Sequence, residues 1–132
     1  MTATIDSIYP KVGEIIADVL SIDIDKIQLN KSLVNDLGAE SIDFLYLVFC
    51  LEREFKIKIP QGQIEERVRA SLAEGEFDKA GIITSIGIAV LRNYLSEVPK
   101  ERFKQSMKVG DIPTLFTVET FCKLVVNAKN ST

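Results

Sequence analysis

LVNDLGAESIDFLYLVFCLEREFKIKIP, residues 33–60, is the stretch that decides the expected fold. Its first part has turn chemistry, because Asp36 can bond its own backbone and Gly38 tolerates a positive φ. Ser41 stands where a helix N-cap belongs, and every residue from 44 to 51 is apolar or aromatic. Eight such residues cover about two helical turns, so the predicted helix is apolar all round. A surface helix of a small domain buries one face, and the other face must be covered or kept for a partner.

The segment DLGAES followed by IDFLYLVFCLEREFKIKIP resembles the acyl carrier protein family. The signature of that family is an Asp-Leu-Gly-x-Asp-Ser-Leu-Asp stretch opening a helix that ends in acidic residues, Phe and Ile-Pro. The positions that match in register are Asp36, Leu37, Gly38, Ser41, Asp43, Leu47, Glu52, Glu54, Phe55, Ile59 and Pro60. Glu40 replaces the usual Asp, and Ile42 replaces the usual Leu. A weaker match extends over residues from about 5 to 60 and from about 109 to 129, so the segment between them is an addition.

The resemblance implies that Ser41 is modified by another enzyme. A phosphopantetheinyl transferase would place 4′-phosphopantetheine from coenzyme A on its hydroxyl, and the thiol of this cofactor would carry an acyl chain as a thioester. A helix N-terminus suits the attached phosphodiester, because it offers free N–H groups and the positive end of the helix dipole. The alternative is that Ser41 merely caps the helix. The matched register favours modification.

We expect the whole chain, residues 1–132, to form a single all-α domain, a four-helix bundle of the acyl carrier type. Apolar spacing predicts a first helix over residues 7–20, and a second over residues 41–56 that Pro60 ends. The last helix starts from Thr117, which is a suitable cap. An extra helical insertion lies between the second and last long helices.

This insertion, residues 61–108, is predicted to hold a helix over residues 64–72 and another capped by Thr84 or Ser85. The Ser-Ile pair at Ser85 repeats the pair at Ser41, which raises the idea of a second carrier site. No Asp-Leu-Gly turn precedes it, so we interpret Ser85 as a helix cap.

The chain contains no histidine, which removes the commonest general base, the Ser-His and Cys-His nucleophile pairs and the usual zinc ligand. Cys50 and Cys122 lie far apart in apolar helical patterns and are expected to be buried reduced thiols rather than a disulfide or a metal pair. We therefore expect no enzyme, no catalytic residue and no metal site. A small hydrolase that uses Ser41 is the least favoured alternative, since no base is placed beside it.

The predicted partner-docking residues surround Ser41. They are Glu40, Ile42, Asp43, Leu45, Tyr46 and Phe49.

Residues 1–60 carry ten acids and six bases, a net charge of −4, whereas residues 61–132 carry nine acids and ten bases, a net charge of +1. The acidic half suits basic partner surfaces and argues against nucleic acid. Tyr46 and Arg53 replace acids of the family, so the partner surface is more aromatic than that of a general fatty-acid carrier. The aromatic and apolar residues here, Phe44 among them, either pack under the insertion or meet partners and the acyl chain.

We therefore expect an acyl carrier dedicated to one fatty-acid or lipid pathway, lipid A-like or very-long-chain. Its expected partners are the phosphopantetheinyl transferase, acyl-loading enzymes, ketosynthases, acyltransferases and the acyl chain itself. The alternative is a non-carrying adaptor that binds a partner through the apolar helix while Ser41 stays unmodified.

The N-terminal segment MTATIDSIYP lacks the basic and apolar regions of a signal peptide. No run approaches the ~20 apolar residues of a membrane span. The sequence therefore predicts a cytoplasmic monomer without stable membrane insertion.

Overall fold

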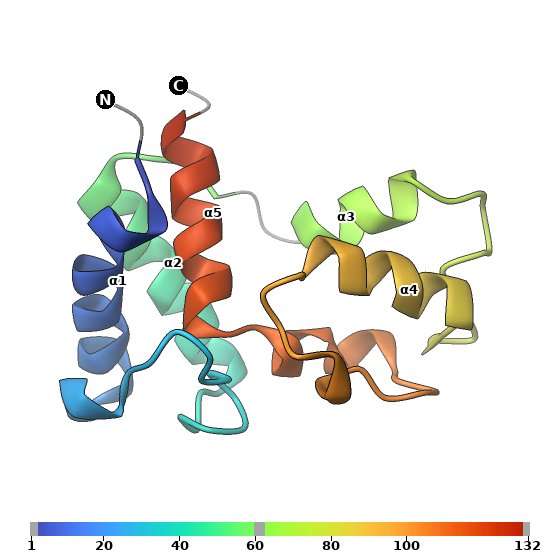
Figure 1. The fold of residues 1–132 in the computed structure, drawn as a ribbon, viewed down its shortest axis with the longest axis horizontal. Coiled ribbons are helices and arrows are strands. Elements are labelled where there is room, and N and C mark those ends of the chain that lie inside the picture. The colour runs from blue at the N-terminus through green and yellow to red at the C-terminus, as the bar shows by residue number, and fades with distance from the viewer. Residues whose placement is uncertain (1–2, 60–62, 131–132) are drawn as a thin grey trace. The chain divides into compact units, whose positions relative to one another are not determined.

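The computed structural model describes residues 3–59 and 63–130, so Pro60 lies outside the described residues. The chain forms two compact units. Unit 1 contains residues 1–59 and 116–132, and unit 2 contains residues 60–115 (Figure 1). The predicted all-α class with a helical insertion is confirmed, because α-helices and short 3₁₀ turns dominate the described part of the chain.

Unit 1 is built around long helices. They are α1 (Ile5–Leu20), α2 (Ser41–Phe55) and α5 (Val118–Asn130), with the 3₁₀ turn η1 (Ile24–Lys26) after the first. All three helices contact one another (Figure 1). α1 starts before residue 7, the predicted start, because Thr4 and Ser7 cap each other. Thr4 Oγ1 accepts from the Ser7 N–H at 3.2 Å, and Ser7 Oγ accepts from the Thr4 N–H at 3.0 Å.

The core of unit 1 takes side chains from each long helix. Its most deeply buried members include Val12, Ile16, Leu47, Leu51, Val118 and Val125. Cys122 lies in this core, and burial raises the pKa of its thiol to about 12, so the sulfur stays protonated. Cys122 is buried as predicted, whereas Cys50 is only partly buried, and both are free thiols.

The loop before α2 is fastened to the start of α5. The Leu33 N–H donates to the Phe116 carbonyl at 3.1 Å, and Ser32 forms a bridge with Thr117. Thr117 Oγ1 also accepts from the Thr120 N–H at 3.1 Å, which confirms that Thr117 caps α5. These contacts therefore hold the first residues of the turn that leads into α2 against the start of α5.

Unit 2 mixes short helices with a small hairpin. Its elements are α3 (Gln63–Ala70), β1 (Asp78–Lys79), β2 (Ile82–Ile83), α4 (Ser85–Tyr94), η2 (Lys100–Arg102) and η3 (Val109–Leu115). The antiparallel hairpin was not predicted. Its two-residue loop has φ 54° at Ala80 and φ 84° at Gly81, and a left-handed Ala gives little sequence signal for such a turn. Phe77, Ile83, Leu91 and other apolar side chains bury a core of their own in this unit.

Candidate functional site

The turn that precedes α2 is held by side chains of its own. Asp36 Oδ2 accepts from the Ser32 N–H at 2.8 Å, and Ser32 Oγ accepts from the Asn35 N–H at 3.1 Å. Gly38 has φ 77°, which favours glycine at this position. Asp36 therefore stabilises the turn, a structural role for a residue that the family signature contains.

α2 begins at Ser41, and Glu40 is its N-cap, so the prediction that Ser41 is the cap is wrong by one residue. The reason lies on both sides of Glu40. The N–H of the buried Ala39 donates to the Leu33 carbonyl at 2.8 Å, which holds the chain extended up to Glu40. Asp43 Oδ2 accepts from the Glu40 N–H at 2.8 Å, as the third residue of a capping box does.

The Ser41 hydroxyl is exposed, and within the described residues it forms no hydrogen bond. Because capping is done by its neighbours, this oxygen is left available for substitution. It projects from the first residue of a 15-residue helix. The first N–H groups of a helix lack intrahelical acceptors, and the helix dipole is positive there, so an attached phosphodiester fits this position.

An exposed apolar face runs from Ser41 along α2. Ile42, Leu45, Tyr46 and Phe49 are 69%, 55%, 57% and 53% exposed. Their spacing of i, i+3, i+4 and i+7 puts them on one side of the helix, which we call the exposed α2 face. Leu47 and Leu51 on the other side are buried in the core of unit 1. The structure thus brings the predicted apolar docking residues together beside Ser41, with Glu40 exposed and Asp43 partly exposed at the same end.

Phe44 departs from the other aromatic residues of α2 because it packs inside unit 1. Its ring lies 5.9 Å from that of Phe121, in a stacked arrangement, and 6.2 Å from that of Phe116, edge to face. Sequence analysis missed Phe116 as a member of this cluster, since its position just before Thr117 carries no periodic signal.

The other end of α2 shows a further residue that sequence analysis left without a role. Glu52 Oε2 accepts from the Ile59 N–H at 2.8 Å and so fastens the segment that follows the helix. Arg53, which replaces an acid of the family, places its guanidinium 5.8 Å from the centre of the Phe49 ring. The exposed α2 face therefore ends in a cation.

The second Ser-Ile pair lies at the start of α4, and the structure decides between the two caps that the sequence left open, Thr84 and Ser85. Thr84 is the N-cap, and its Oγ1 accepts from the Gly87 N–H at 3.0 Å. Ser85 is the first residue of α4, so Thr84 is confirmed as the cap and the interpretation of Ser85 as the cap is wrong. Thr84 takes the role because it also bonds the carbonyl of Glu76, which fixes its position.

Two further findings concern the part of the chain that the structure describes. In it, no group of three or more His, Cys, Asp and Glu side chains is arranged to hold a metal ion. Of its helices, none is both long and apolar enough to cross a membrane.

Comparison with known proteins places α2 and its turn in a known family. Residues 10–75, half of the chain, match the family model described as "Phosphopantetheine attachment site". The acyl carrier protein of Bdellovibrio bacteriovorus is 42% identical over 60 residues, which cover 46% of this chain and 77% of that protein. That of Clostridium acetobutylicum is 42% identical over 59 residues, covering 45% and 77%. The acyl carrier protein AcpXL of Mesorhizobium japonicum is 48% identical over 52 residues, covering 39% and 56%. The chain therefore belongs to the acyl carrier protein family, whose cofactor is covalently attached 4′-phosphopantetheine.

Proposed function

We propose that the Ser41 hydroxyl is the attachment point of 4′-phosphopantetheine and that the chain carries acyl groups without catalysing their transfer. The observation that carries this proposal is the exposed and uncommitted Ser41 oxygen at the first residue of α2, inside the segment that matches the family model. When attached, the cofactor supplies a thiol that holds an acyl chain as a thioester. The residues of this chain hold the modified oxygen at a helix N-terminus and present it to solvent.

The exposed α2 face is the docking surface for the enzymes that act on this arm. Its four apolar side chains start next to Ser41, and Phe49 lies about 12 Å further along the helix axis, at 1.5 Å per residue. Exposed apolar groups clustered on one face mark an interaction site more often than scattered ones do. The carboxylates of Glu40 and Asp43 at the same end favour basic surfaces on the transferase, acyl-loading enzymes, ketosynthases and acyltransferases.

A dedicated lipid pathway, lipid A-like or very-long-chain, is the finer part of the proposal. It is supported by Tyr46 and Arg53, which stand where the family pattern has acids, and by the compact unit 2 between α2 and α5. Similarity to two carriers named AcpXL supports it as well, the one from Rhizobium meliloti being 43% identical over 68 residues.

Intact mass spectrometry tests the attachment site. The full chain is measured before and after incubation with coenzyme A and a broad-specificity phosphopantetheinyl transferase. Ser85→Ala is the matched control for Ser41→Ala, because both serines are the exposed first residue of an α-helix. We expect the wild type and Ser85→Ala to gain one phosphopantetheine group and Ser41→Ala to gain none.

Modification of Ser41→Ala would contradict the site. If the wild type gains nothing from the broad enzyme, the host's own transferase is used, since Glu40 lengthens the carboxylate before the serine. Failure with both enzymes would contradict attachment at Ser41 and favour the non-carrying adaptor. In that case the Ser41→Ala variant should keep its full function in the host.

A further inference from the structure

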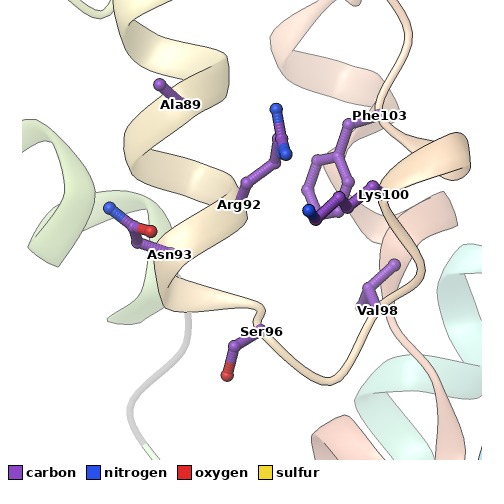
Figure 2. A pocket seen from close by; sticks show the side chains of 7 residues that line it. All are labelled: Ala89, Arg92, Asn93, Ser96, Val98, Lys100 and Phe103. Carbon is purple, nitrogen blue, oxygen red and sulfur yellow. The ribbon is translucent and has the colours of Figure 1, made fainter.

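Unit 2 contains a pocket that is lined by residues of unit 2 and has no part in the proposed carrier chemistry. It has a volume of about 410 Å³ and lies between α4 and the segment around η2 (Figure 2). This volume falls within the range of about 300–1,000 Å³ that small-molecule sites occupy. The pocket is therefore large enough for a small organic ligand.

Two cations of the pocket face the same space. The side chains of Arg92, in the last turn of α4, and Lys100, at the start of η2, extend toward each other beside the ring of Phe103 (Figure 2). Neither forms an ion pair with another described residue, and no carboxylate lines the pocket. Two like charges that share a hollow without a counter-charge create a positive potential, which an anion would relieve.

The remaining walls combine apolar and neutral polar groups. Val98 is buried, Phe103 is half-buried, and Ala89 lies on α4. Asn93 and Ser96 add side chains that form hydrogen bonds without adding charge. A ligand that suits this lining has a strongly anionic group joined to an apolar or ring-shaped part.

We propose that this pocket binds an organic phosphate monoester, with the phosphate between Arg92 and Lys100 and its organic part against Phe103 and Val98. A monoester carries a charge of about −1.5 to −2 at pH 7, which matches two cations better than the single charge of a carboxylate does. The guanidinium can donate two parallel hydrogen bonds to phosphate oxygens, and the ammonium adds a point charge. The site is independent of Ser41.

The ligand chemistry has two sources, an alkyl phosphate of the lipid type and a nucleotide. Backbone amide shifts of the ¹⁵N-labelled full chain would be followed by NMR during titration with octyl phosphate, adenosine 5′-monophosphate and inorganic phosphate. We expect saturable shifts at residues 89–103 with one of the organic probes, at a Kd below about 1 mM. The tighter of the two identifies the source, and inorganic phosphate binds more weakly because it lacks the organic part.

Variants of the lining residues test whether the organic phosphate binds in this pocket. Arg92→Gln and Lys100→Gln should each weaken binding about tenfold, since a hydrogen bond to a charged group is lost. Lys104→Gln is the matched control, because it removes the same charge from an exposed residue of unit 2 that does not line the pocket. Affinity should rise between pH 5 and pH 8, because the second pKa of a phosphate monoester is about 6.

Three results would overturn the proposal: no saturable shift with either organic probe, equal weakening by Lys104→Gln, or inorganic phosphate binding as tightly as both organic probes. Ser41→Ala should bind as the wild type does. Failure of the carrier proposal would thus leave this site intact, and the reverse also holds.

Discussion

The starts of α2 and α4 are alike in sequence and differ in their surroundings. Each helix opens with an exposed Ser-Ile pair whose serine is the first helical residue. In α4 the third residue is Gly87, which is buried, and its N–H donates to Thr84 Oγ1 at 3.0 Å. In α2 the third residue is Asp43, which is partly exposed and accepts from the Glu40 N–H at 2.8 Å.

This difference shows that a serine at the first turn of a helix does not by itself make a carrier site. The start of α4 is closed on one side, because a Cβ added to Gly87 would lie 2.4 Å from the Phe77 carbonyl oxygen. The start of α2 is open and acidic, and it follows a turn that Asp36 and Gly38 stabilise. The match to the family model ends at residue 75, before α4 begins.

Replacing Gly87 should have the largest effect on stability. In Gly87→Ala, the new methyl group would overlap the Phe77 carbonyl oxygen and lie 2.8 Å from the Ile83 Cγ2 atom. That carbonyl also accepts from the Thr84 N–H at 2.9 Å, so it cannot move away freely. We expect α4 to lose about 2–3 kcal/mol of stability against opening, as overpacking does elsewhere. Residue-resolved hydrogen exchange at Leu91 would measure the change.

Gly110→Ala is the matched control for this substitution, because nothing lies within 4 Å of a Cβ added there and no positive φ is required. It should leave the exchange of α4 nearly unchanged. Unaltered exchange at Leu91 in Gly87→Ala would show that the start of α4 is as open as that of α2, and the comparison would fail.

The isoleucines of the two pairs allow a comparison of recognition. Ile42 is 69% exposed and Ile86 is 51% exposed, each at the second residue of its helix. If the exposed α2 face docks the transferase, Ile42→Ala should lower kcat/KM for phosphopantetheinylation about tenfold, the effect of removing a contact worth about 1.4 kcal/mol. Ile86→Ala should stay within about twofold of the wild type. Both rates come from timed intact-mass measurements at low carrier concentration.

Equal rates for Ile42→Ala and the wild type would remove Ile42 from the docking surface. An equal loss in both variants would instead indicate that the transferase contacts the two helix starts without discriminating between them.

The sequence predicted the long helices, the cap at Thr117 and the cluster of residues around Ser41, because each depends on local periodicity or on a matched signature. It did not predict that Glu40 rather than Ser41 is the N-cap. That outcome depends on the Leu33 carbonyl, seven residues away in the chain, and on which way the Asp43 carboxylate turns. Cap propensities rank serine above glutamate, and they take no account of the contacts made by the Leu33 carbonyl and the Asp43 carboxylate.

The sequence also could not predict which aromatic side chains of α2 point into the core and which stay exposed. The run from residue 44 to 51 is apolar throughout, so its pattern does not distinguish an inward face from an outward one. Phe44 turns inward because Phe116 and Phe121 are there to meet it, whereas Tyr46 and Phe49 stay exposed. Such a contact between distant segments is set by the fold.

The smallest expected effect concerns the hydroxyl cap of α4, in place of which the start of α2 has the contact between Glu40 and Asp43. Thr84 Oγ1 accepts from the Gly87 N–H and donates to the carbonyl of Glu76, so Thr84→Ala leaves one donor and one acceptor without this partner. Loss of an N-cap hydroxyl costs about 1 kcal/mol, and hydrogen exchange at Leu91 should report that decrease. Thr84→Ser keeps the hydroxyl and should retain most of the stability.

Modification at Ser41 should proceed at the wild-type rate in both variants, since the α2 start is held by Asp43 and Ala39. If Thr84→Ala slowed that modification, the two helix starts would be coupled, and their contrast could not be explained by local surroundings alone.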